Sequence, residues 1–238
     1  MGRRLILGDE IIEKIDCEIS IRYSELLEAL EKKDKHIYEG VIFHIGQGLS
    51  QSERDTLYKI SSQQKLFDIN GKKSTIELKE MVHKKKSHNV MISEPIKNDD
   101  IYTSTLLLDD SCDEVSDHVT GLHIQGIVLF ESCRQMMLAV SERFLFKKLT
   151  SKDQMRCILN TTNTDYLCFA FPVETQIKMK VENNKQVKKR QFCFKSTFQI
   201  TQNERVVAII QIDFLLVSEQ NIAKLENKLY NKAIYNAV

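Results

Sequence analysis

The spacing of apolar residues along residues 1–75 predicts alternating strands and helices. Three short apolar runs have the length of buried strands: 5–7, 40–45 and 66–69. Two segments between them are rich in helix formers: 22–33 and about 51–62. Ser50 and Glu53 have the spacing of a capping box at the start of the second helix. This order of elements predicts a small parallel α/β unit of unknown role.

Residues 76–219 follow a different pattern, which predicts an α+β domain. The stretch 124–147 has helical length and is apolar on almost every side, as expected of a buried helix. Apolar runs predict strands at 88–93, 102–108, 177–181, 192–200 and 206–217. Polar clusters at 183–185 and 202–204 predict the turns between the last three. We therefore expect one long buried helix wrapped by about five, mostly antiparallel, strands.

The last segment, 220–238, predicts a C-terminal amphipathic helix. Its apolar residues recur at roughly helical spacing: Ile222, Leu225, Leu229 and Ile234. We expect this face to pack on its own domain rather than on a partner.

Composition narrows the classes of function. The chain has 34 Lys and Arg against 33 Asp and Glu, so no basic field predicts a nucleic-acid partner. The longest apolar run, 206–217, contains Gln211 and Asp213, so we expect no membrane span. The N-terminus is too short for a secretory signal, and we expect the protein in the cytoplasm with its six cysteines reduced. No cysteine has the spacing of a metal ligand, so we expect no metal.

One polar cluster stands out on the predicted buried helix. Glu131, Arg134 and Gln135 lie at i, i+3 and i+4 and share a helix face. Burying a carboxylate and a guanidinium is costly unless they are paired or used. The residues alone favour equally a polar active site and a Glu131–Arg134 ion pair with Gln135 tying the helix to a strand.

A glycine-rich loop follows the second predicted strand. Gly46-Gln47-Gly48 precedes a capped helix, an arrangement that can cradle a phosphate. The third glycine of a dinucleotide fingerprint is missing, so a role in stabilising the fold or in dimerisation is the preferred interpretation.

The order of elements in residues 76–219 resembles the hotdog fold. The residues His118-Val-Thr-Gly121 and Gly126-Ile-Val-Leu-Phe-Glu131 are similar to a pattern of β-hydroxyacyl-ACP dehydratases, with one residue fewer between the glycines and without its Phe and two Pro. The closer resemblance, over about 81–218, is to the A-factor biosynthesis (AfsA-like) hotdog family. It is carried by Val82-His83-Lys84 and by Glu131-Ser-Cys-Arg134-Gln135.

This resemblance implies an enzyme of acyl-thioester chemistry. The founding members of the family make γ-butyrolactone signals by transferring a β-ketoacyl group from acyl carrier protein to the hydroxyl of glycerone phosphate. It implies acyl carrier protein or coenzyme A as the carrier of the substrate and no other cofactor. Those members contain two hotdog repeats, whereas this chain shows one, which implies a homodimer. The alternatives are a non-catalytic acyl- or partner-binding module, and a dehydratase or thioesterase.

Residue chemistry suggests a role for each site residue. The catalytic candidates are His118 as general base, Glu131 to orient it or share its proton, and Gln135. Arg134 is expected to bind a phosphate or carboxylate of the substrate. Gly121 and Gly126 would let substrate approach the backbone at the helix N-terminus, whose dipole polarises a thioester carbonyl. His123 is a weaker substrate-binding candidate and is better explained as a loop or cap residue. Three residues are candidate walls of an acyl slot or plain core: Phe130, Met136 and Met137.

Overall fold

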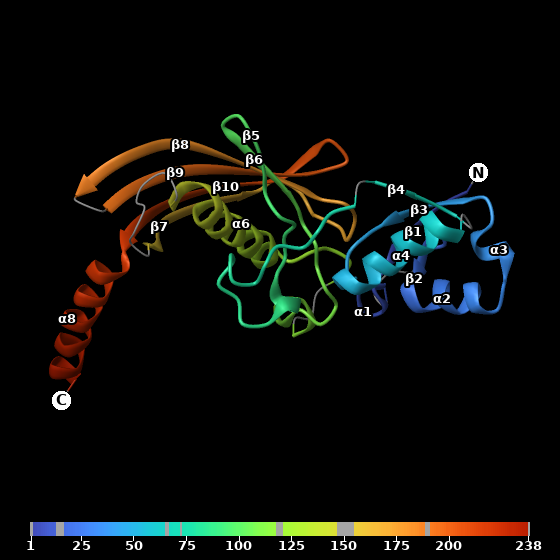
Figure 1. Cartoon of the computed structure of the whole chain (residues 1–238), viewed down its shortest axis with the longest axis horizontal. Coiled ribbons are helices and arrows are strands. Elements are labelled where there is room, and N and C mark those ends of the chain that lie inside the picture. Colours follow the sequence, from blue (N-terminus) through green and yellow to red (C-terminus); the bar gives the residue numbers. More distant parts are fainter. Residues whose placement is uncertain are drawn as a thin grey trace.

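Two β-sheets, one parallel and one antiparallel, organise the chain (Figure 1). The computed structural model describes residues 2–12, 17–64, 67–71, 73–117, 121–146, 155–188 and 191–237. No helix within these ranges is long and apolar enough to cross a membrane.

The N-terminal sheet is parallel, as the sequence predicts, with strand order β2-β1-β3-β4. Its strands are β1 (Gly2–Leu7), β2 (Ser20–Arg22), β3 (Val41–Ile45) and β4 (Asp68–Asn70). The helices between them are α1 (Asp9–Ile12), α2 (Tyr23–Glu31), α3 (Lys35–Tyr38) and α4 (Gln51–Gln64). The predicted capping box is present, because the Ser50 amide donates to Glu53 Oε2 at 2.8 Å and the Glu53 amide donates to Ser50 Oγ at 3.4 Å.

The second sheet is antiparallel and wraps one long helix (Figure 1). Its order is β5-β6-β8-β9-β10-β7, formed by β5 (Ile96–Asn98), β6 (Ile101–Thr105), β7 (Met155–Tyr166), β8 (Gln176–Lys188), β9 (Gln191–Gln202) and β10 (Arg205–Ser218). The wrapped helix is α6 (Gly126–Val140), which continues as a π-helical turn over Ser141–Leu145. The alternation predicted for the strands is confirmed, since Ile177, Met179, Phe194 and Phe198 are buried in a core shared with α6. The predicted turn after β9 is also confirmed, with positive φ at Asn203 and Glu204.

Three expectations for this part of the chain are wrong in detail. Residues 88–93 form no strand. They begin in a 3₁₀ turn (Ser87–Asn89), where the Gln135 side chain hydrogen-bonds the backbone of Asn89 and Met91. Beyond the turn, Ile92 and Ser93 form isolated bridges to Leu106 and Ile76 rather than a continuous strand. The turn predicted at 183–185 lies inside β8, because pairing with β9 continues to Lys188 and overrides local turn propensity. The helix is not buried on every side, since the apolar Ile127 is exposed.

The C-terminal helix α8 (Glu219–Ala237) forms as predicted but does not pack on its own domain. Ile222 is buried, whereas Leu225, Leu229 and Ile234 are about half exposed. The helix projects away from the sheet (Figure 1). The expectation that its apolar face is covered within the chain is therefore wrong, because the helix leaves the body after its first turn.

The glycine-rich loop joins the two sheets. Gln47 is buried and donates from Nε2 to the carbonyls of Leu106 and Val173, both at 3.1 Å, while its Oε1 accepts from the Leu108 amide at 2.8 Å. The amides of Gly46, Gln47 and Gly48 all donate to backbone carbonyls of other segments. Because these amides are occupied, they cannot cradle a phosphate. The structure thus supports the preferred interpretation, a loop that stabilises the fold.

Candidate functional site

A polar cluster is centred on Glu131 near the start of α6. Arg134 binds the Glu131 carboxylate with two N–H groups, Nε to Oε2 at 2.6 Å and Nη2 to Oε1 at 2.8 Å. Lys84 Nζ lies 3.0 Å from Glu131 Oε1 and 2.6 Å from Glu114 Oε1. The two predicted family segments, 82–84 and 131–135, therefore meet in space.

This cluster holds its carboxylate charged. Burial raises the pKa of Glu131, but hydrogen bonds from Arg134, Lys84 and Gln135 lower it by more, so the pKa of Glu131 is below its usual range. Burial likewise lowers the pKa of Lys84, and Glu114 and Glu131 together raise it above its usual value. Glu131 is thus suited to positioning charged groups rather than to donating a proton near neutral pH.

Gln135 lies inside the protein, fully shielded from solvent. Its Nε2 donates to the Asn89 carbonyl at 2.9 Å and to Glu131 Oε1 at 3.1 Å, and its Oε1 accepts from the Met91 amide at 2.9 Å. Both ends of the amide are therefore occupied. The geometry matches the helix-tying interpretation of Gln135, and its catalytic role stays a prediction.

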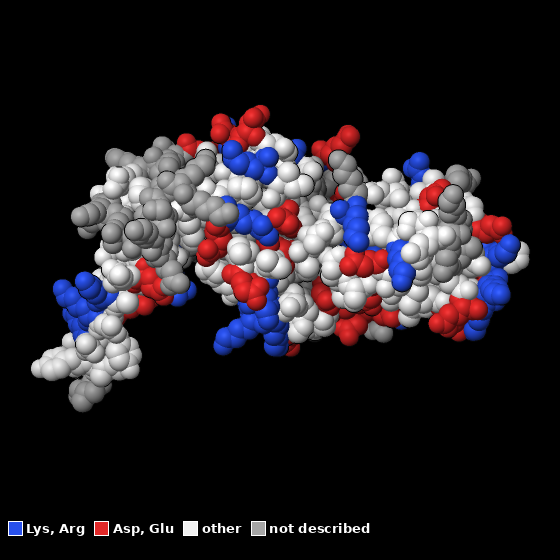
Figure 2. Space-filling model, viewed as in Figure 1, with Lys and Arg blue, Asp and Glu red and all other residues white. Residues whose placement is uncertain are grey.

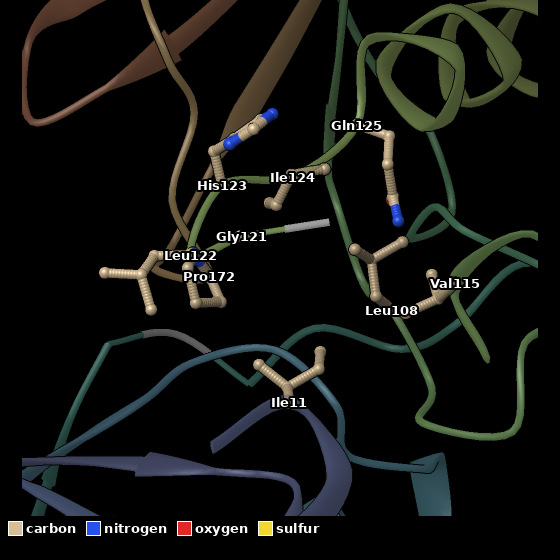
Figure 3. A pocket seen from close by; sticks show the side chains of 9 residues that line it. All are labelled: Ile11, Leu108, Val115, Gly121, Leu122, His123, Ile124, Gln125 and Pro172. Atoms are coloured by element: carbon tan, nitrogen blue, oxygen red, sulfur yellow. The ribbon is translucent and has the colours of Figure 1, made fainter. Parts of the chain in front are cut away.

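A small pocket, with a cavity volume of about 40 Å³, lies between the N-terminal sheet and the start of α6 (Figure 3). Ile11 of α1 faces it from one side, and Leu108 and Val115 face it from the other. The remaining lining residues are Gly121, Leu122, His123, Ile124, Gln125 and Pro172. Sequence reasoning found Gly121 and His123 but missed Ile11, Leu108 and Pro172, because these come from segments that only the fold brings together.

The short helix α5 (Asp113–Ser116) connects the pocket to the cluster. Val115 lines the pocket, and the neighbouring Glu114 accepts the hydrogen bond from Lys84. The apolar space and the charged groups are therefore on adjacent residues of one helix, as a site for a molecule with an apolar chain and a polar head requires.

The two predicted glycines have different surroundings. A Cβ on Gly126 would lie 2.7 Å from Tyr166 Cζ, and the Tyr166 hydroxyl donates to the Gly126 carbonyl at 2.8 Å. The space at Gly126 is thus taken by Tyr166 and not left for substrate. Among the described residues, none has an atom within 4 Å of a Cβ placed on Gly121, so these residues leave the backbone there open to an approaching ligand.

Most of the remaining candidates have packing contacts rather than free polar groups. The ring of His123 packs on Phe169, with centroids 4.8 Å apart. Met136 and Met137 belong to the core, and Phe130 packs against it, which matches the plain-core interpretation. His118, the predicted general base, lies outside the described residues.

Comparisons with known proteins identify the family. The profile of the A-factor biosynthesis hotdog domain matches residues 68–218, which is more than half of the chain. No curated protein is similar enough to count as a relative. Similar solved structures include a mutant thioesterase of Pseudomonas aeruginosa (10% identity, TM-score 0.38, covering 53% of this chain and 81% of that one). A conserved protein of the same organism is similar at 17% identity and a TM-score of 0.41, covering 59% of this chain and 100% of that one. A thioesterase of Haemophilus influenzae is similar at 12% identity and a TM-score of 0.37, covering 56% of this chain and 81% of that one.

The predicted α+β class with a hotdog fold is confirmed by the family match and by the long helix wrapped in an antiparallel sheet. The chain belongs to the A-factor biosynthesis hotdog family.

Proposed function

We propose that this protein binds an acyl thioester, carried on acyl carrier protein or coenzyme A, and transfers its β-ketoacyl group to a small hydroxylated acceptor such as glycerone phosphate. The product would be a γ-butyrolactone-type signal or a related secondary metabolite. Family membership supports the class of chemistry. The observation that carries the proposal is the apolar pocket at the start of α6, next to the Lys84–Glu131–Arg134 cluster.

The pocket suits the acyl end of the substrate. Ile11, Leu108 and Ile124 give it apolar walls, and the open backbone at Gly121 lets a thioester approach the chain closely. The N-terminus of α6 begins at Gly126, so its dipole favours negative charge on a carbonyl oxygen bound at this end of the helix.

The cluster suits the acceptor. Arg134 is about a third exposed, and only two of its five N–H groups reach Glu131. Its outer edge can bind the phosphate of an acceptor while Glu131 fixes the guanidinium plane. In the sequence, His118 lies three residues before the pocket-lining Gly121. As general base, it would remove the proton from the hydroxyl group of the acceptor.

The same proposal includes a homodimer. The edge strand β7 pairs with β10 on one side and has no strand on its other side within the described residues. A strand of 12 residues with an unpaired edge is a template for another strand. Two chains paired through β7 would join their sheets edge to edge.

One observation favours a second candidate, a binding module without catalysis. The Glu131 carboxylate already accepts from Arg134, Lys84 and Gln135, so it has little capacity left for a reacting proton. In that case the pocket would hold an acyl chain, or a partner, without chemical change.

Mass spectrometry of a β-ketoacyl carrier protein incubated with the full chain separates these functions. Loss of the acyl group only when glycerone phosphate is present supports acyl transfer. Loss of water or plain hydrolysis indicates a dehydratase or thioesterase, and an unchanged thioester in a stable complex indicates the binding module. Ile11→Asp places a charge in the pocket and should abolish all of these outcomes, whereas Ile19→Asp, at an exposed position, should not.

A further inference from the structure

Two apolar surfaces are uncovered within the described residues. The first, here called the α8 stripe, consists of Leu225 and Leu229, which are 53% and 54% exposed and lie on the same helix face as the buried Ile222. The second, here called the Tyr166 patch, consists of Leu122, Ile127, Tyr166, Leu167, Phe169 and Phe171, which are 45% to 67% exposed. Large exposed apolar surfaces on a globular chain mark contact sites.

The two surfaces lie at opposite ends of the same edge strand. Ser218 pairs with Met155, so α8 begins beside the first residue of β7. The Arg156–Glu219 ion pair, at 2.6 Å, fixes this start of the helix. At the other end, Tyr166 is the last residue of β7 and pairs with Ala208. A strand of this length spans roughly 40 Å, and α8 projects away from the sheet (Figure 1), so α8 does not reach the patch of its own chain.

A two-fold axis brings the two surfaces together in a dimer. When two copies of an edge strand pair antiparallel along their whole length, with the two-fold axis at the middle of the strand, the first residue of one lies beside the last residue of the other. Pairing through β7 therefore puts Met155, and the base of α8, next to Tyr166 of the partner subunit. Each chain would supply one α8 stripe and one Tyr166 patch, so the contact would form twice.

We infer that α8 docks in trans on the Tyr166 patch of a second copy of this chain. This inference rests on the homodimer in the proposed function and deepens it. Four residues of the patch, Tyr166, Leu167, Phe169 and Phe171, line an open groove of about 570 Å³ together with Cys168 and Arg205. Towards the C-terminus, the exposed surface of α8 is mostly uncharged on the face shown in Figure 2.

The docked helix would complete the acyl pocket. Leu122 belongs to the patch and also lines the pocket, and Phe169 of the patch packs on the pocket residue His123. Helix α8 of one protomer would therefore cover the outer side of the pocket of the other. The substrate site is then a property of the dimer, with one wall given by the partner copy.

Photo-cross-linking of isotopically mixed dimers tests the docking. The probe is p-benzoylphenylalanine in place of Leu229 in a nitrogen-15 chain, mixed with unlabelled chain and left to exchange subunits. We expect cross-links between a heavy and a light chain that end within residues 166–171. The matched control carries the probe in place of Asn227, which lies two residues before Leu229 and so on nearly the opposite face of the helix. This control should cross-link to residues 166–171 much less.

Sedimentation measures the contribution of the stripe to the dimer. Leu225→Gln with Leu229→Gln should raise the dissociation constant of the dimer at least about tenfold, since two leucines lose an apolar partner. Lys224→Gln with Lys228→Gln on the same helix should leave it unchanged.

The outcomes separate the inference from the proposed dimer. A chain that sediments as a monomer at micromolar concentration overturns both. A dimer whose Leu229 cross-links stay within one chain, or end outside 166–171, overturns the docking and leaves the edge-to-edge dimer standing. Cross-links that appear only after acyl carrier protein is added also overturn it, because the patch would then take a different partner.

Discussion

Lys84 Nζ lies 3.0 Å from Glu131 Oε1, although the two residues belong to segments far apart in the sequence. Lys84 ends the Val-His-Lys segment, and Glu131 begins the Glu-x-x-Arg-Gln segment on α6. The two sequence features of the family are thus parts of one ion cluster, which fixes the loop before β5 to the helix.

Replacing Glu131 tests how much this cluster contributes to the free energy of unfolding. Glu131→Gln leaves Lys84 and Arg134 without their shared carboxylate, and because the site is partly buried we expect a loss of about 1–3 kcal/mol in the free energy of unfolding. Since the pKa of Glu131 is lowered by folding, its contribution is present above about pH 4.5 and disappears as pH falls through the folded pKa. Urea unfolding at pH 7 and pH 4 measures both effects. Lys32→Gln, which removes the exposed ion pair with Glu28, is the control and should change little.

Gln47→Leu tests the junction between the two sheets. The leucine is similar in size but leaves the Leu108 amide and the Leu106 carbonyl without the Gln47 side chain, while the Val173 carbonyl keeps its hydrogen bond from Thr175 Oγ1. We expect a loss of about 2–4 kcal/mol in the free energy of unfolding, seen as a lower urea midpoint. Gln63→Leu, at an exposed position on α4, is the matched control. Equal midpoints for the two variants would contradict the role of Gln47.

Asp110 gives the junction a pH dependence. Burial raises the pKa of Asp110 to about 6, although the amides of Glu10 and Ile11 lower it in part. Between about pH 4 and pH 6, Asp110 is therefore protonated in the folded chain but ionised in the unfolded chain. The free energy of unfolding falls as the pH rises through this range. Asp110→Asn removes the charge. We expect the variant to match the natural chain at pH 4 and to be more stable by about 1–2 kcal/mol at pH 8, after allowance for solvent screening.

Thermal unfolding at several pH values, with Asp68→Asn as an exposed control, provides the comparison. A constant difference between Asp110→Asn and the natural chain across pH 4 to 8 would show that the Asp110 charge is not the cause.

Alanine substitutions at Gly126 and Gly121 should have different effects, the first on stability and the second on ligand binding. Gly126→Ala places a methyl group against the Tyr166 ring and should cost about 1–3 kcal/mol in the free energy of unfolding. Gly121→Ala places a methyl group where no other described residue lies within 4 Å and should leave the melting temperature almost unchanged. The same methyl group narrows the acyl pocket and should weaken turnover or acyl binding. Combining Gly126→Ala with Tyr166→Ala should recover part of the stability, because the clashing ring is gone. The opposite ranking of the two single variants in stability would refute this assignment.

Much of the architecture follows from local patterns. The 2-residue period at Ile177, Met179 and Val181 predicts β8, and Ser50 with Glu53 predicts the start of α4, because these signals depend on neighbours along the chain. The same reasoning predicts the Glu131–Arg134 pair, since i and i+3 positions face each other on any helix.

The failures come from contacts between distant segments. Residues 88–93 begin in a 3₁₀ turn whose end is bound by Gln135 of α6, and they continue as isolated bridges to Leu106 and Ile76 rather than as a strand. The space beside Gly126 is occupied by the Tyr166 side chain, because the end of β7 lies next to the start of α6. Periodicity cannot report such contacts, since each depends on which side chain the fold brings to the position.

The sequence alone was sufficient for the class of fold and for the helix face that carries Glu131, Arg134 and Gln135, because periodicity and helical spacing are local properties. The family followed from the resemblance of two short motifs, which the family match confirms. The long-range fold was needed to bring Lys84 to Glu131, to build a pocket from Ile11, Leu108 and Pro172, and to turn Gly46-Gln47-Gly48 into a junction. It also left the apolar face of α8 uncovered. In each case the partner comes from a distant segment, and its position depends on the packing of the whole chain.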